Sequence, residues 1–258
     1  MHCQLRNNDA VHKIFNALDI KKRDYDTANP LMKFAPVEAA LSRDESQQLA
    51  GKSQRTRMAL IRSAERLFGD LGIDAVGLRA VCEAAHQKNN NSVQYHFGSK
   101  LGLLAAIFEY REAQLQPMRQ AMLDEAEKHG RLGDVRWLLR VCFEPNFRLY
   151  RDHHDVHYMK LHAAYLSTHR PRGVLHPIDT DSPNCVSYRR AVALMQQRLR
   201  FIDKKRLWLR LESVGTMFLS TFIQHAARKD HKTLPIDELH EDMVEMMASA
   251  ISAPPFHS

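Results

Sequence analysis

Neutral amides lie directly ahead of an aromatic–imidazole–aromatic triplet in the stretch "AHQKNNNSVQYHFGSK", residues 85–100. A carboxamide can form two hydrogen bonds to an adenine edge, and a serine hydroxyl can donate to or accept from several bases. Four residues are therefore candidates for contacting base edges: Asn90, Asn91, Ser92 and Gln94. Asparagine also suits tight turns, so Asn89 and Asn90 have the alternative role of building a turn.

Positive charge is concentrated around this stretch. The chain of 258 residues has a formal net charge of +7. Residues 52–100 contain eight Lys and Arg against four Asp and Glu, a balance of +4 in 49 residues. Such a cluster is typical of a protein that contacts nucleic-acid phosphates, although basic residues also serve solubility.

Other kinds of chemistry find little support in the residue pattern. The chain contains no G-x-S-x-G, H-E-x-x-H, P-loop or G-x-G-x-x-G motif, so we expect neither enzyme activity nor a cofactor. His153 and His154 both lie about one helical turn before His157, but no third ligand is evident. We therefore expect no metal site.

The cysteines and the apolar segments indicate the cellular compartment. The four cysteines are far apart, at Cys3, Cys82, Cys142 and Cys185, which suggests neither a disulfide framework nor a zinc site. No apolar run is long enough for a signal peptide or a membrane span. We expect a cytoplasmic protein with no membrane partner.

Helices are the elements that must position residues 85–100. Ten Gly and ten Pro are few for this length, which favours an all-α fold. An apolar stripe predicts a first helix from about residue 54 to residue 71, and Gly72 follows where a helix commonly ends.

Shorter patterns follow this helix. They predict a short second helix over 78–85 after Gly77, a third over about 91–97, and a long fourth helix capped by Ser99. Two short helices joined by a turn and preceded by a basic segment are typical of a helix-turn-helix, in which one helix braces the phosphates and the next enters the major groove.

Helical stripes continue to the C-terminus. They cover residues 132–144, 153–167, 184–202, 204–228 and 236–251. Pro145 should end or kink one of these helices, and residues 168–183, with three prolines, should be a loop. Residues 1–51 contain one short amphipathic pattern, Val11 to Leu18, and should form a loosely ordered extension.

Residues 55–108 resemble the N-terminal DNA-binding domain of TetR/AcrR-type transcriptional regulators. The matching segments are "RTRMALIRSAERLFGDLGIDAV" (55–76), "LRAVCEAA" (78–85) and "VQYHFGSKLGLL" (93–104). The tyrosine, His-Phe and Gly-Ser-Lys block lies at the family's distance from the first helix.

The resemblance implies three domains and a set of DNA contacts. The extension of residues 1–51 would precede a helix-turn-helix domain over 52–100 and an effector-binding and dimerisation domain over 101–258. Three residues match the family's phosphate contacts: Tyr95, His96 and Lys100. Phe97 would pack in the core. Arg55 and Arg57 would reach the DNA backbone or minor groove, with a solvated helix start as the alternative.

The match departs from the family pattern around the turn. The usual Ala-Gly is Ala85-His86 here, and the small residue that opens the recognition helix is replaced within residues 89–92. The turn is one residue longer than the commonest form. A longer turn changes which side chains can reach the bases.

The implied function is a homodimeric repressor that binds a near-palindromic DNA operator and responds to a small-molecule effector. The helices over 204–228 and 236–251 would pack against the same pair from a second subunit, with Ser213, Gly215 and Ser220 allowing close approach. A helical protein–protein interaction or ligand-carrier module without DNA binding is the alternative, and activation in place of repression stays open.

The effector would bind in the C-terminal domain. Tyr158, His162 and Tyr165 share one predicted helix and are candidates for hydrogen bonds to a hydrophobic or aromatic effector, with core packing as the alternative for each.

Overall fold

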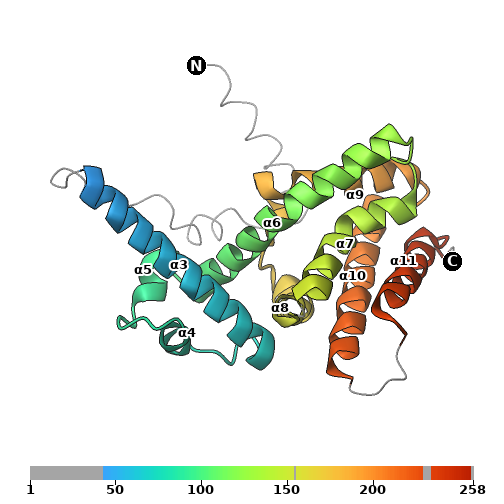
Figure 1. Ribbon diagram of the computed structural model, residues 1–258. Helices are drawn as coiled ribbons and strands as arrows, with labels where there is room; N and C mark the ends of the chain where they lie inside the picture. The colour runs from blue at the N-terminus through green and yellow to red at the C-terminus, as the bar shows by residue number, and fades with distance from the viewer. Residues whose placement is uncertain (1–42, 154, 229–233, 257–258) are drawn as a thin grey trace. The chain divides into compact units, whose positions relative to one another are not determined.

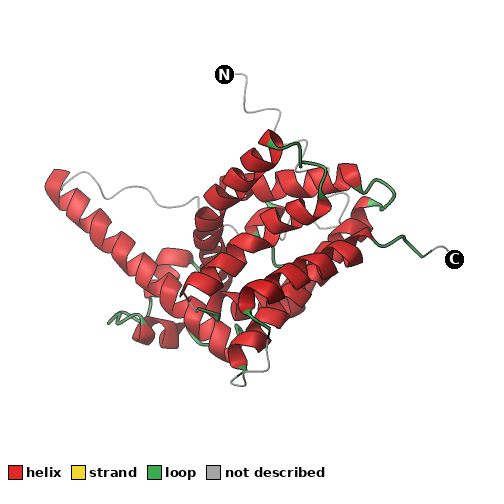
Figure 2. Cartoon of the chain, turned by 45° about the vertical axis from the view of Figure 1, so that its right-hand side comes forward, coloured by secondary structure: helices red, strands yellow, loops and turns green. Residues whose placement is uncertain are grey.

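A computed structural model describes residues 43–153, 155–228 and 234–256, and these residues form helices joined by turns, with no strand among them (Figures 1 and 2). The predicted all-α fold is confirmed. The amphipathic pattern predicted around residues 11–18 lies outside the described residues. All side-chain contacts below lie within residues 53–258, which form one unit. None of the described helices is long and apolar enough to cross a membrane.

The four predicted N-terminal helices are present as α3 (Arg43–Leu71), α4 (Leu78–Ala84), α5 (Ser92–Phe97) and α6 (Lys100–Lys128). The predicted start of the first helix near residue 54 is wrong, because α3 begins eleven residues earlier. Residues 43–53 are mostly Glu, Gln, Arg, Lys and Ala, which favour helix without forming an apolar stripe. A search for periodic apolar residues therefore misses this polar part of the helix.

The ends of these helices follow the predicted signals. Gly72 and Gly98 have positive φ values of 87° and 72°, a backbone conformation that glycine adopts without steric cost. Ser99 caps α6, and its side chain accepts a hydrogen bond from the backbone N–H of Gly102 at 3.0 Å. These caps fix where the chain leaves α3 and α5.

The C-terminal helices are α7 (Val135–His153), α8 (His157–Ala164), α9 (Val186–Arg198), α10 (Lys204–Ala227) and α11 (Ile236–Ser252). Of the two predicted effects of Pro145, ending a helix is wrong, because α7 continues through Pro145 to His153, while a kink stays a prediction. Asn146, Phe147 and Tyr150 after the proline are buried, and this packing offsets the hydrogen bond that proline cannot donate.

The predicted loop over 168–183 is more structured than expected. α8 is followed by a π-helical turn, η2 (Tyr165–His169), and by a 3₁₀ turn, η3 (Arg170–Arg172). Two further 3₁₀ turns, η4 (Pro177–Asp179) and η5 (Pro183–Cys185), each start with a proline. Proline suits this first position because its fixed φ is already helical and its missing N–H has no helical partner to lose.

The buried apolar residues form two clusters. One cluster surrounds α3, α4 and α5 and includes the first half of α6 and three residues of α8 and η2. The other lies among the end of α6 and α7, α9, α10 and α11. Helix α6 contributes to both clusters, so it connects the N-terminal helices to the C-terminal ones (Figure 1). The domain limits predicted at 51/52 and 100/101 stay predictions.

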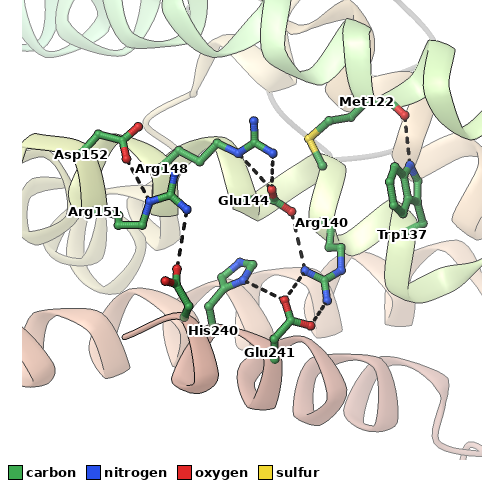
Figure 3. Close-up of polar contacts among 10 residues, drawn as sticks. Met122, Trp137, Arg140, Glu144, Arg148, Arg151, Asp152, His240 and Glu241 are labelled. Carbon is green, nitrogen blue, oxygen red and sulfur yellow. Dashed lines mark hydrogen bonds and ion pairs between the residues drawn. The ribbon is translucent and has the colours of Figure 1, made fainter. Parts of the chain in front are cut away.

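Ion pairs connect α7 to α11 along their exposed sides. Arg140 pairs with Glu241 of α11 and lies 3.7 Å from Glu144, which also pairs with Arg148 (Figure 3). Because these side chains are only partly buried, the pairs orient the helices more than they stabilise the fold.

The position of Gly215 in α10 differs from the one predicted for the dimer interface. A Cβ atom on Gly215 would lie 3.3 Å from the Phe143 ring of α7, and Gly215 is buried within the chain. The small size of this residue therefore permits packing of α10 on α7, and the predicted role of Gly215 at a subunit interface is wrong. Ser213 is exposed and Ser220 is partly exposed.

Candidate nucleic-acid interface and effector site

The turn between α4 and α5 covers residues 85–91. His86 has a φ of +53°, the left-handed conformation that glycine adopts more readily. For a residue with a Cβ atom this conformation costs about 1–2 kcal/mol. The backbone at this position therefore has the form that the usual Ala-Gly sequence would supply, although the residue is histidine.

Asn89 builds the turn. Its side-chain Oδ1 accepts a hydrogen bond from the backbone N–H of Asn91 at 2.9 Å. Its carbonyl oxygen accepts the hydroxyl of Ser92 at 2.7 Å and the N–H of the same residue at 3.1 Å. The alternative interpretation of Asn89 as a turn residue is the one that these contacts support.

Two of the candidate base-contacting residues take part in the same turn. Ser92 is buried, and its hydroxyl is already engaged with Asn89, so little of it faces outward. The carbonyl oxygen of Asn90 accepts the thiol of Cys82 at 3.4 Å, while the Asn90 residue as a whole is exposed.

Three residues form an exposed surface on α5. Asn91 and Gln94 are exposed and about one turn apart, and Tyr95 is 74% exposed beside them. Side chains of this kind on a short helix after a turn can reach base edges and phosphates in a major groove. We call Asn91, Gln94 and Tyr95 the α5 surface.

The residues behind the α5 surface are packed. Phe97 is buried, as predicted, and the Arg57 guanidinium carbon lies 5.1 Å from the centre of its ring. Burial and the positive charge of Arg57 lower the pKa of His96 below its ordinary value. His96 is therefore a neutral hydrogen-bonding group near pH 7. Arg55 is exposed on α3.

Lys100 has a role within the fold that the sequence did not indicate. Its ammonium donates to the backbone carbonyl of Ile73 at 2.8 Å and to that of Asp74 at 3.2 Å. These bonds hold the connection between α3 and α4 against the start of α6. An ammonium has three donors, so one N–H remains for a phosphate.

The candidate effector residues lie in an aromatic cluster around Phe108 of α6. The ring centres of Tyr158, His162 and Tyr165 are 6.3, 5.4 and 4.8 Å from that of Phe108. His176 lies at 4.4 Å from Phe108 and stacks on His162, with an interplanar angle of 5°. Sequence reasoning missed His176, because it belongs to a proline-rich connection far along the chain.

Burial keeps the two stacked histidines neutral. Burial, together with the positive charges of nearby Arg170 and Arg119, lowers the pKa of His162 to about 3. The pKa of His176 is likewise depressed by burial and by His162. His176 Nδ1 accepts the N–H of Ile178 at 3.2 Å, so the single proton of the neutral ring lies on Nε2.

A buried ion pair adjoins this cluster. Glu112 and Arg119 of α6 pair with each other, and both side chains are about 2% exposed. The pair influences the pKa of Tyr158, which burial raises well above its ordinary value. The spacing of seven residues places Glu112 and Arg119 on one face of a helix, and that spacing is a sequence signal that could have identified them.

The histidines first considered for a metal have other neighbours. His157 Nδ1 lies 3.0 Å from a carboxylate oxygen of Asp70, and His153 is exposed. His154 lies outside the described residues. Within the described ranges no group of three or more His, Cys, Asp or Glu is placed to hold a metal ion.

The helix-turn-helix region matches a known family model. Residues 60–107 match the model described as "Bacterial regulatory proteins, tetR family". These residues contain the end of α3, the turn and the α5 surface. This segment is therefore similar to the tetR family of bacterial regulatory proteins. The predicted resemblance to TetR/AcrR-type regulators is confirmed, and with it the coarse function of a DNA-binding transcription regulator.

Solved structures of TetR-family proteins resemble the chain over most of its length. A TetR family transcription regulator from Marinobacter aquaeolei VT8 superposes with a TM-score of 0.53 at 18% identity, covering 78% of this chain and 97% of the other. A putative TetR-family transcriptional regulator from Mesorhizobium loti MAFF303099 gives a TM-score of 0.42 at 16% identity, with 78% and 96% covered. The search of curated proteins found no match. The first comparison supports the shared fold.

Proposed function

We propose that the protein is a ligand-responsive repressor that binds a near-palindromic operator as a homodimer. The observation that carries this proposal is the α5 surface, which presents Asn91, Gln94 and Tyr95 outward within residues that match the TetR-family model. Asn91 and Gln94 would read base edges, while Tyr95, His96 and the free N–H of Lys100 would contact phosphates. Arg55 and Arg57 would add contacts from α3, Asn90 would add one from the turn, and Ser92 would act by holding that turn.

The subunit interface would form on the exposed face of α10 and α11. Leu209 of α10 is 64% exposed, and Ser213 and Thr216 continue the same face at helical spacing. Both hydroxyls donate to carbonyls of their own helix, at 2.9 Å each, so the face needs no outside partner for them. Met246 of α11 is 52% exposed and offers a second apolar contact. A two-fold pairing of this face would present two α5 surfaces to half-sites about one DNA turn apart.

The effector would act on the contact between α3 and α8. Tyr158, His162 and Tyr165 belong to α8 and η2. The start of α8 meets the end of α3, where a Cβ atom on Gly69 would clash with the carbonyl oxygen of His157. A ligand that favours a different position of α8 would therefore shift α3 and change the spacing of the two α5 surfaces.

DNA binding by the purified chain tests the proposal. We expect a labelled duplex from upstream of the chain's own gene to bind with an affinity that falls steeply as salt rises, and a binding-site selection to return an inverted repeat. Sedimentation should give a dimer whose association weakens in Leu209→Arg, while Leu175→Arg, at an exposed leucine outside α10 and α11, should remain dimeric. A chain that binds no DNA but still dimerises would favour the interaction-module alternative.

A further inference from the structure

A cavity of about 470 Å³ lies where the N-terminal helices meet the C-terminal ones. Its lining comes from α3, α6, α7 and the start of α8 and includes Arg62, Arg66, Arg111, Leu149 and Tyr158. The volume falls within the usual range for small-molecule sites. It is separate from most of the aromatic cluster around Phe108, because only Tyr158 of that cluster lines it.

The mouth of this cavity is positively charged. Arg62 and Arg66 are exposed, one turn apart on α3, and make no ion pair with any of the described residues. Arg111 also lines the cavity, as do Glu65 and Asp155. Three arginines against two carboxylates leave a balance of +1 among the Arg, Asp and Glu side chains of the lining, and the two arginines without an ion pair are on α3.

The inner wall of the cavity includes aromatic and apolar side chains. Tyr110 and Tyr150 line the cavity together with Leu149 and Met159. Asn146 Oδ1 and the Tyr158 hydroxyl belong to lining residues and form no hydrogen bond with any of the described residues, but both atoms are fully buried behind the cavity surface. The wall that a ligand would touch is therefore formed mainly by aromatic and apolar side chains.

An ion pair between α3 and α6 forms part of the same wall. Arg111 Nε donates to Glu65 Oε2 at 2.7 Å, a second guanidinium N–H pairs with the other carboxylate oxygen, and a third bonds Gln114 at 3.1 Å. The Arg111 guanidinium also lies 5.3 Å from the centre of the Tyr158 ring. A molecule in the cavity would therefore touch the bonds that hold α3 to α6.

We propose that this cavity binds a small aromatic carboxylate, with its carboxylate between Arg62 and Arg66 and its ring against Tyr110, Tyr150 and Leu149. Two arginines one turn apart can hold the two oxygens of one carboxylate, and the apolar wall takes the ring. Bound there, the ligand fixes α3 relative to α6 and α8. Its effect on operator affinity rests on the proposed function, whereas its binding does not.

Fluorine NMR of small probes tests the proposal directly. The full-length protein is titrated with 4-fluorobenzoate, with 4-fluorobenzylamine as the cationic counterpart and 4-fluorobenzyl alcohol as the neutral one. We expect 4-fluorobenzoate to bind at least tenfold more tightly than either counterpart. Equal or tighter binding of the amine overturns the assignment to anions, and absence of binding by 4-fluorobenzoate overturns the site.

Variants show whether the probe occupies this cavity. The double change Arg62→Gln and Arg66→Gln should weaken 4-fluorobenzoate about tenfold or more, since two charge-assisted contacts are lost. Leu149→Trp should block the ring while leaving the charges in place. The matched control, Arg198→Gln with Arg200→Gln, removes two exposed arginines elsewhere and should leave binding unchanged.

Measurements of thermal stability and of DNA binding distinguish the possible outcomes of these experiments. Thermal melting of each variant identifies any that fails to fold, and if Leu149→Trp does, Arg62→Gln with Arg66→Gln decides alone. Unchanged 4-fluorobenzoate binding in a folded cavity variant overturns the proposal. If wild-type protein binds its operator but not 4-fluorobenzoate, only the cavity assignment fails; if it binds 4-fluorobenzoate but no DNA, only the proposed function fails.

Discussion

Two faces of the N-terminal helices differ in how completely they are paired. On the α5 surface, Asn91, Gln94 and Tyr95 are exposed. On the side of α3 that meets α6 and α8, Glu65 is buried and paired with Arg111, and Asp70 is held by Lys160 and His157. Changes on the first face should therefore alter what the protein binds, and changes on the second should alter whether the helices hold together.

The largest effect should come from breaking the buried pair between α3 and α6. We expect Glu65→Gln to lower the free energy of unfolding by about 3–5 kcal/mol, because Arg111 would keep a largely buried charge without its partner. Urea denaturation measures this change. Glu83→Gln, which breaks an exposed pair with Arg79, is the control and should cost less than about 0.5 kcal/mol. Equal effects of the two changes would remove the distinction between the faces.

Acidic pH should also lower the stability of the protein, through the protonation of His162 in the unfolded state. The folded state keeps His162 neutral down to a pKa of about 3, while the unfolded chain takes up a proton near the ordinary value of 6.5. Between these values the unfolded state binds more protons, so stability falls as pH falls. We expect His162 to contribute a loss of about 2 kcal/mol between pH 7 and pH 5. Urea denaturation at both pH values should show a smaller loss in His162→Gln, and an identical loss would assign the acid sensitivity to other groups.

Substitutions on the α5 surface should change the DNA-binding specificity but not the stability of the protein. Gln94→Ala or Asn91→Ala should relax base preference at one or two operator positions by about 1–3 kcal/mol each. Neither change should alter the free energy of unfolding by more than about 0.5 kcal/mol, since both residues are exposed. Binding-site selection measures the first quantity and urea denaturation the second. The same selected motif from both variants would move base reading to other residues.

A glycine at position 86, in the turn before α5, should stabilise the protein. His86→Gly should raise stability by about 1 kcal/mol, because glycine adopts the positive φ at this position without the cost borne by histidine. Thermal melting detects the shift. Gln87→Gly, next to it but without a positive φ, is the control and should not stabilise the protein.

Lys100 is both a candidate phosphate contact and a donor to the α3–α4 connection, and its replacement should have the smallest effect of these changes. Lys100→Ala should lower the slope of log affinity against log salt by about one contact and weaken DNA binding nearly uniformly across sequences. It should also lower stability modestly, since two carbonyls of the α3–α4 connection lose their donor. A loss of stability with an unchanged salt slope would assign Lys100 to the buried side alone.

The sequence predicted the helices whose signals are local. The end of α3, the start of α4 and the end of α5 follow from Gly72, Gly77 and Gly98, and the start of α6 follows from Ser99, because caps and glycines act within a few residues. The polar start of α3 and the passage of α7 through Pro145 could not be read in this way. The first has no apolar stripe, and the second depends on packing between distant segments.

The residues of the candidate site also differ in whether the sequence alone could identify them. Asn91 and Gln94 could be chosen from residue type and Tyr95 from the family resemblance, and the structure leaves all three exposed. Lys100 and His176 could not be placed, since each is defined by a partner far along the chain: two carbonyls before α4, and the stacked ring of His162. Ser92 is predicted as a base contact, although its hydroxyl is engaged by the turn carbonyl of Asn89.

The approach of Gly69 to the carbonyl of His157 limits how freely this protein can be rebuilt from parts. A hybrid protein would join the DNA-binding helices of one regulator to the C-terminal helices of another. Here the final turn of α3 accepts no side chain at that point, and the next residue, Asp70, must meet Lys160 and His157. A working hybrid would have to exchange α3 and α8 as a matched pair, with its junction placed elsewhere.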